Sequence, residues 1–154
     1  MLLQAKVDNA AAVFSSELVS VPVERRSRKW DCALSETIIG DYLIVPLTSA
    51  KMLKNEGYRM INCCRDYAAQ CANLKYCIFS IRTRSGERLA SLGLKNDRGY
   101  WHFDQCFGLA NTEVLEETLE FIDENGVPQT ECYPTELYYV AHDVVRMMNS
   151  VSSH

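Results

Sequence analysis

Three short apolar segments follow one another between residues 76 and 107, and glycine-containing turns join them. They read YCIFSIR, ERLASLGL and YWHFDQCF, with TRSG and KNDRG between them. Turns this short bring consecutive strands together antiparallel, so the pattern predicts a three-stranded β-meander. Side chains alternate between the faces of a strand, which predicts Trp101 and Phe103 on one face and His102 and Cys106 on the other.

Helical patterns surround this meander. Thr48 or Ser49 is placed to cap a helix that Gly57 would end, and the segment EGYRMINCCRDYAAQC would then begin a second helix. In that second helix Met60, Cys64 and Cys71 recur at helical spacing and share one face. The run DYLIVPL before these helices has the character of a short strand.

Two further helices are predicted toward the C-terminus. Asn111 or Thr112 would cap the first, which carries Leu115, Leu119 and Ile122 and would be closed by Gly126 and Pro128. The second begins after Pro134 and presents an apolar stripe formed by Leu137, Val140, Ala141, Val144, Val145 and Met148. The sum is an α+β fold: one domain over residues 1–154, with a small antiparallel meander whose helices cover one face.

The overall charge limits the classes of partner. The net charge is −4, which argues against a general polyanion-binding protein, because such affinity comes mostly from neutralising phosphates. The cluster RRSRKW, Arg25 to Trp30, is a dense basic run with a stacking ring, and nucleic-acid binding through it is an alternative that the acidic total does not favour. Residues 9–19 have helical character and ELVSVPV has extended character.

The N-terminus lacks the basic segment of a secretory signal, and no apolar run reaches the length of a membrane span, so we expect a cytoplasmic protein without membrane contact. The seven cysteines are expected to be reduced thiols there. Cys63 and Cys64 would point about 100° apart on a helix, which does not suit one metal ion. The sequence therefore predicts packed cysteines, with neither metal nor cofactor.

Cysteine-dependent catalysis is the sharper alternative for these thiols, because a thiol next to a histidine can act as a nucleophile. His102, Asp104 and Cys106 would share a strand face, but side chains two residues apart lie about 6.6 Å from each other, too far for a relay. We assign no catalytic residue.

Several of these segments together resemble the PcfJ-like family, over residues 47–125. The resemblance lies in a helix with the pattern EG-x-x-M-x-H-C-x-x-x-Y, an S-x-R strand and a closing Q-x-x-G-x-x-N. The positions are Glu56, Gly57, Met60, Cys63, Tyr67, Ser80, Arg82, Gln105, Gly108 and Asn111. Asn62 stands where the family usually has histidine, so a His-Cys centre would lack its base here.

The resemblance implies an accessory protein of a plasmid, phage or other mobile element, with an N-terminal extension and a C-terminal helix added to the core. A small acidic domain in that setting suits a non-enzymatic inhibitor that binds a host or element-encoded protein complex, such as a phage counter-defence protein. The alternatives are a cysteine-dependent or nucleic-acid-processing enzyme and a nucleic-acid-binding accessory factor. For the partner surface we expect some of Trp30, Arg82, Arg84 and Tyr100, because these residue types often dominate interfaces.

Overall fold

The computed structural model describes residues 28–152. The expected helix over 9–19, the extended segment ELVSVPV and Arg25 and Arg26 of the basic cluster lie outside the described residues. The body is built on a sheet of five antiparallel strands in the described part of the chain, in the order β2-β3-β4-β5-β6. These strands are β2 (Thr37–Ile39), β3 (Tyr42–Pro46), β4 (Tyr76–Thr83), β5 (Arg88–Asp97) and β6 (Tyr100–Phe107).

This arrangement confirms the predicted α+β class and the predicted meander, and it adds β2 at the edge. The run DYLIVPL provides β3, which pairs with β4. The connection between β3 and β4 contains α3 (Ala50–Met60), the 3-10 helix η1 (Cys64–Tyr67) and α4 (Ala68–Ala72). The C-terminal helix is α5 (Glu136–Ser152).

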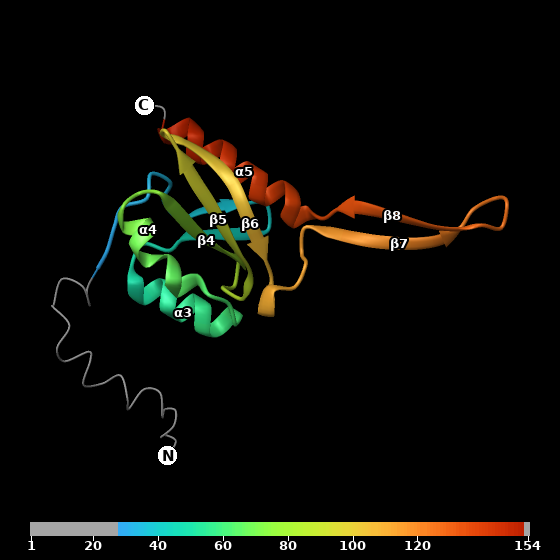
Figure 1. Ribbon diagram of the computed structural model, residues 1–154, viewed down its shortest axis with the longest axis horizontal. Coiled ribbons are helices and arrows are strands. Elements are labelled where there is room, and N and C mark those ends of the chain that lie inside the picture. Colours follow the sequence, from blue (N-terminus) through green and yellow to red (C-terminus); the bar gives the residue numbers. More distant parts are fainter. Residues whose placement is uncertain (1–27, 153–154) are drawn as a thin grey trace, which may run out of the picture.

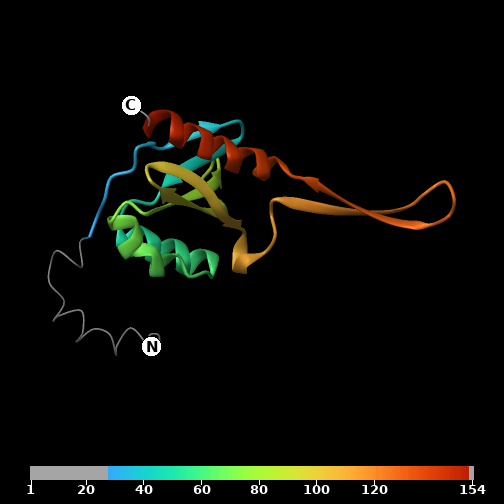
Figure 2. The ribbon, with the colours of Figure 1, turned by 45° about the horizontal axis from the view of Figure 1, so that its top comes forward.

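Helices cover both faces of the sheet, and the prediction that they cover only one was wrong (Figures 1 and 2). Cys77, Phe79 and Ile81 of β4 face α5, whereas Tyr76 and Ile78 face α3 and η1. The reason lies in β4 itself, whose first six residues are all buried. A strand that is apolar on both sides needs a cover on each, as parallel central strands do.

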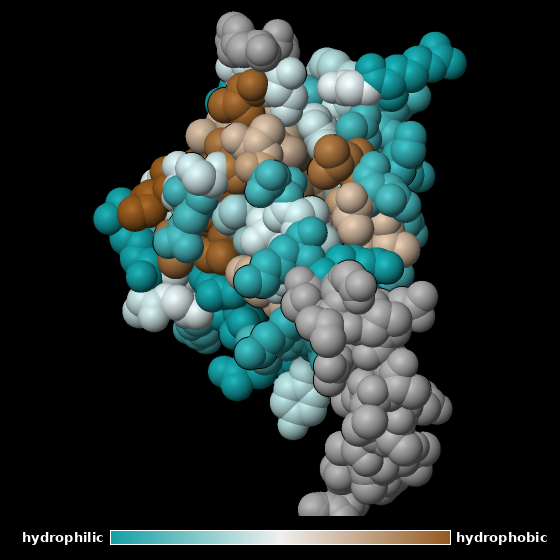
Figure 3. All heavy atoms as spheres, turned by 90° about the vertical axis from the view of Figure 1, so that its left-hand side faces the viewer, coloured by the Kyte–Doolittle hydropathy of each residue, from teal (hydrophilic) through white to brown (hydrophobic). Residues whose placement is uncertain are grey.

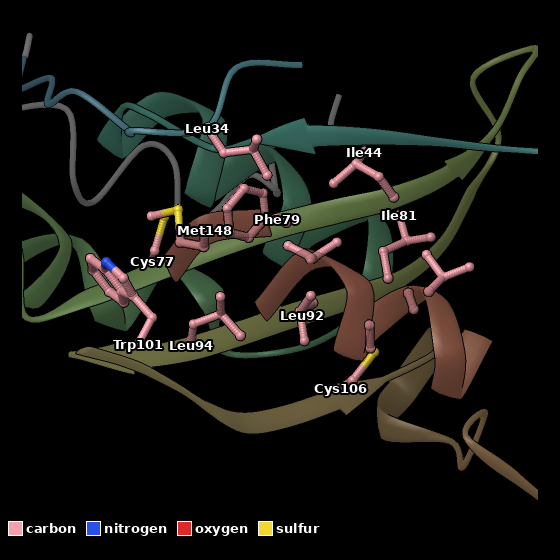
Figure 4. Close-up of a cluster of buried hydrophobic side chains, with 14 residues drawn as sticks. Leu34, Ile44, Cys77, Phe79, Ile81, Leu92, Leu94, Trp101, Cys106 and Met148 are labelled. Carbon is pink, nitrogen blue, oxygen red and sulfur yellow. The ribbon is translucent and has the colours of Figure 1, made fainter. Parts of the chain in front are cut away.

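The larger of the two cores lies between the sheet and α5 (Figure 4). Phe79, Leu92 and Leu94 are fully buried there, and the stripe predicted on α5 supplies Val144 and Met148. The stripe was therefore predicted correctly, and it packs on the sheet face formed by β4, β5 and β6, with β6 nearest to α5. Burying each such side chain contributes about 1.5–3 kcal/mol.

Gly57 does not end the first helix. α3 continues to Met60 and ends at Ile61, whose φ of 53° is left-handed. Gly57 is buried. A Cβ at this position would lie 3.0 Å from the backbone oxygen of Asn62, so the glycine lets the chain after α3 pass close to the helix. The predicted second helix is consequently divided into η1 and α4, although Cys64 and Cys71 are buried as expected.

A β-bulge in β6 changes which side chains share a face. Gly93 pairs with Gln105 but Leu94 pairs with Phe103, so Asp104 is the extra residue. Cys106 therefore joins Phe103 in the core under α5, and the predicted grouping of Cys106 with His102 was wrong. The prediction assumed that side chains alternate strictly between the two faces of the strand, and this assumption does not allow for a bulge.

The helix predicted after Asn111 is a β-hairpin. The short 3-10 turn η2 (Leu109–Asn111) ends the body, and β7 (Glu116–Ile122) then pairs with β8 (Pro128–Pro134). Gly126, with φ of 79°, and Asp123 form the turn at the tip. We call residues 116–134 the arm, which projects away from the body (Figure 1).

Gly93 offers a direct test of this packing. A Cβ at this position would lie 2.1 Å from the Tyr76 hydroxyl oxygen and 2.8 Å from its ring, so the tyrosine would have to move. We expect Gly93→Ala to lower the free energy of unfolding by about 1–3 kcal/mol, measured by urea denaturation. An unchanged midpoint would show that Tyr76 does not pack across Gly93.

Candidate functional site

Four residues of the family pattern line one cleft, although they come from distant parts of the sequence. Cys63 and Tyr67 approach from η1 and its cap, Gln105 from β6, and Asn111 from η2. The enclosed volume is about 40 Å³, which admits a few water molecules or one small chemical group. Gly108 is buried beside it, and a Cβ there would lie 2.6 Å from the Val114 side chain.

A chain of hydrogen bonds forms the floor of this cleft. The Gln105 amide donates to the hydroxyls of Tyr67 and Tyr76, at 3.0 and 3.1 Å. The Tyr76 hydroxyl donates to Asp104 at 2.6 Å, and the bulge places that carboxylate within reach. Burial, followed by the bond to Asp104, raises the pKa of Tyr76, so its hydroxyl stays protonated. Gln105 therefore positions the hydroxyls of Tyr67 and Tyr76.

A buried carboxylate lies behind the cleft. Glu56 of α3 has no exposed surface, and its two oxygens accept from Arg88 Nε at 2.8 Å and from Ser91 Oγ at 2.7 Å. Both partners lie on β5, so this network ties α3 to the sheet. Burying a charge is costly unless it is paired and hydrogen-bonded, and Glu56 meets both conditions.

Asn62 connects this network to the cleft. Its side-chain amide donates to Ser91 Oγ at 3.2 Å, and its carbonyl oxygen accepts from the backbone N–H of Cys64 at 3.0 Å. The family histidine would therefore stand beside a buried serine and glutamate. Asn62 keeps a structural connection at this place but cannot serve as a base near Cys63.

The chain was also compared with models of known protein families. The model of the PcfJ-like protein family matches residues 4–122, more than two thirds of the chain. The chain belongs to the PcfJ-like family. The match begins near the N-terminus, so the expectation that residues 1–45 lie outside it was wrong. No curated protein and no solved structure matches the chain.

The cysteines of this PcfJ-like protein fall into distinct environments. Burial raises the pKa of Cys64 to about 11, and the pKa values of Cys71 and Cys106 to about 12. These thiols are protonated near neutral pH and are therefore weak nucleophiles. Cys63 and Cys132 are exposed. Among residues 28–152, no three His, Cys, Asp or Glu side chains are placed to hold a metal ion.

Two further cysteines touch each other. Cys32 Sγ and Cys77 Sγ lie 3.4 Å apart, which is a contact between thiols and not a disulfide bond of about 2.05 Å. This hydrogen bond lowers the pKa of Cys32 and raises that of its buried partner, whose burial adds to the increase.

His102 is exposed and its ring packs on Tyr100, with centroids 4.9 Å apart. Cys106 is buried on the opposite side of the sheet, in the core under α5. The structure therefore does not bring together the histidine and the cysteine of β6.

The four residues expected at the partner surface do not form one surface. Trp30 packs against the smaller core, and its indole N–H donates to Leu47 O at 3.1 Å. Arg82 donates to Ser80 Oγ and Arg84 to Gly40 O, both near the β4–β5 turn. Tyr100 is 56% exposed but lies at the β5–β6 turn, at the opposite end of the sheet.

Sequence reasoning missed the arm as a candidate site. Each of its strands pairs only with the other among the described residues, and Leu119, Phe121 and Tyr133 project from the same face of the hairpin. They are 53%, 38% and 44% exposed, respectively. The Asn-Gly pair at positions 125–126 between β-forming residues was a hairpin signal that could have revealed it.

Hydrogen bonds close the base of the arm, where Val114 and Leu115 pack against the larger core. The Glu113 carboxylate accepts from the N–H groups of Leu115 and Glu116, at 2.6 and 3.0 Å. Thr135 returns the chain, donating from Oγ1 to Val114 O and from its N–H to Leu115 O. The arm therefore has a defined direction relative to the core.

The Glu56 network predicts that two ion pairs contribute very differently to the free energy of unfolding. Glu56→Gln would leave Arg88, which is 16% exposed, without its counter-charge. We expect a loss of roughly 2–3 kcal/mol of unfolding free energy, below the usual cost of a broken buried pair because glutamine still accepts a hydrogen bond. The exposed pair Asp143–Arg146 is the control, and Asp143→Asn should cost less than about 0.5 kcal/mol. Equal losses in urea denaturation would contradict a clamping role for Glu56.

Thiol burial predicts a reactivity order. In a short pulse of iodoacetamide at pH 8, we expect Cys63 and Cys132 to be alkylated at least tenfold faster than Cys64, Cys71 and Cys106, as read by peptide mass spectrometry. The same pulse in guanidinium chloride, where all thiols are exposed, is the control. Fast native labelling of Cys64 would show that its environment is open.

Proposed function

We propose that this PcfJ-like protein is a non-enzymatic, protein-binding accessory protein of a mobile genetic element. In this proposal it is a counter-defence inhibitor of phage type, and it binds a host protein complex in the bacterial cytoplasm through the arm. The carrying observation is a hairpin that stands clear of the body and exposes Leu119, Phe121 and Tyr133 on one face.

The marginal stability of an isolated hairpin supports a binding role for the arm. A two-stranded hairpin is at most marginally stable by itself in water, and its free strand edges can pair with another chain. The apolar face of Leu119, Phe121 and Tyr133 is too exposed to stabilise the arm by burial within this chain. A partner that covers this face would add the missing burial.

The charge of the arm defines the kind of partner. Residues 116–134 contain six carboxylates and no lysine, arginine or histidine, whereas the other residues include 16 basic and 14 acidic side chains. The negative charge of the whole protein is thus concentrated on the arm. An acidic, aromatic-bearing hairpin complements a basic protein surface of the type that normally binds nucleic acid.

The test compares two sets of charge changes that leave the fold intact. Glu117→Gln, Glu120→Gln and Glu131→Gln remove three charges from the arm, and Glu36→Gln, Asp41→Asn and Glu87→Gln remove three exposed charges from the body. Affinity capture from nuclease-treated bacterial lysate, with quantitative mass spectrometry, identifies the proteins retained by each form.

We expect the arm variant to lose a specific partner at least tenfold and the body variant to retain it, because the charges of the arm would face that partner. Phe121→Ser should also lose the partner, since truncating a true anchor costs roughly 2 kcal/mol or more of binding. Equal capture by all forms, with unchanged thermal melts, would refute docking through the arm.

A further inference from the structure

A basic track runs along the outer side of α3, on the body and away from the arm. Lys51, Lys54, Arg59 and Arg65 are exposed, and none of them forms an ion pair with a residue of the described part of the chain. The remaining part of the RRSRKW cluster joins this track. Lys29 forms a β-bridge with Ser49, and Arg28 O accepts from the N–H of Ala50, so both basic residues lie beside the first turn of α3.

An unusual aromatic residue lies in the middle of the track. Tyr58 is 82% exposed, more than any other large apolar or aromatic side chain of the described residues, although its neighbours are charged. Two shallow hollows meet at Lys54 and Tyr58, one toward Lys51 and one toward Asn62 and Arg65. We call these two adjoining hollows, which share Lys54 and Tyr58, the α3 groove. Asp66 is the acidic side chain that lines it.

The groove leads into the cleft of the family pattern, because Asn62 and Cys63 line both. That cleft offers uncharged hydrogen-bonding groups. The Tyr67 O–H has no acceptor and Gln105 Oε1 no donor among residues 28–152, and the Asn111 side chain is also unpaired within this range. A neighbouring donor and acceptor of this kind match the edge of a nucleobase.

We propose that the α3 groove is a binding site for a short single-stranded nucleic acid. Lys51, Lys54 and Arg65 would contact backbone phosphates, Tyr58 would stack on one base, and the cleft would receive polar groups of another. Cations that follow the backbone, combined with an exposed aromatic ring, form the usual single-strand platform, with sites of about 4 nucleotides or more. A duplex would bind less well, because its bases cannot stack on Tyr58.

This inference goes beyond the proposed function and concerns a different face of the molecule. It also differs from the expectation that was drawn from net charge. The overall −4 disfavoured a polyanion ligand, but the acidic residues that produce it are concentrated on the arm, and the other residues are net positive. Both surfaces can act in one protein, and each has its own test.

The direct test is fluorescence anisotropy of the full chain with labelled 12-nucleotide probes of one mixed sequence, as single-stranded DNA, single-stranded RNA and duplex DNA, at 50 mM NaCl. We expect saturable binding of single strands that is at least tenfold tighter than binding of the duplex. The comparison of DNA with RNA identifies the sugar that the groove accepts. With three phosphate contacts, the slope of log K against log salt should be about −2.

Three variants examine the named residues. Tyr58→Ala should weaken single-strand binding at least fivefold, since a stacked base contributes about 1–3 kcal/mol. Lys54→Gln with Arg65→Gln should weaken it about tenfold and make the salt slope less steep by roughly 1.4. The matched control is Arg98→Gln with Arg146→Gln, which removes the same charge from exposed positions on the β5–β6 turn and on α5.

Several results would overturn the proposal. One is the absence of single-strand binding at 50 mM NaCl, and another is an equal loss in the control variant, which would indicate diffuse electrostatic attraction. Duplex binding as tight as single-strand binding and insensitive to Tyr58→Ala would also refute it. So would concentration-dependent self-association that Lys54→Gln with Arg65→Gln abolishes, because the groove would then receive the acidic arm of a second copy.

Discussion

The burial of β4 on both faces is the constraint on which the rest of the body depends. Phe79 and Ile81 require a cover on one side, and Tyr76 and Ile78 require one on the other. α5 provides the first cover, while α3 and η1 provide the second. The end of the body opposite the arm carries mostly hydrophilic side chains, with apolar residues in separate groups (Figure 3). With both sheet faces covered, the exposed apolar side chains of the arm, Leu119, Phe121 and Tyr133, lie outside both cores.

The same packing places the family pattern around one cleft. Glu56 ties α3 to β5 through Arg88 and Ser91, and Gly93 leaves room for the Tyr76 ring. The bulge in β6 then lets Asp104 and Gln105 meet the Tyr76 hydroxyl. Asn62 is held by two hydrogen bonds, to Ser91 and to the backbone of Cys64. The cleft is therefore lined by side chains that hydrogen bonds hold in place.

Sequence patterns predicted the meander, α5 and the burial of Cys64 and Cys71, because each has a strong local period and clear turn signals. They missed features that depend on non-local contacts. Leu115, Leu119 and Ile122 also fit a helical spacing, which was given more weight than the Asn-Gly signal at 125–126, and the pairing of β7 with β8 forms a hairpin. The bulge at Asp104 and the convergence of Gln105 with Tyr67 also follow from tertiary packing. Net charge likewise contains no information about where the acidic residues lie, and six of the 20 lie on the arm.

The central claim is that the arm contacts a basic protein surface. Site-specific photo-cross-linking measures this most directly, with a benzophenone amino acid at Leu119 on the arm or at Tyr139, which is 57% exposed on α5. The account predicts that the Leu119 probe cross-links a partner in bacterial cells at a peptide rich in lysine and arginine, and that the Tyr139 probe does not. Cross-links from Tyr139 alone, or from Leu119 to peptides without basic residues, would contradict it.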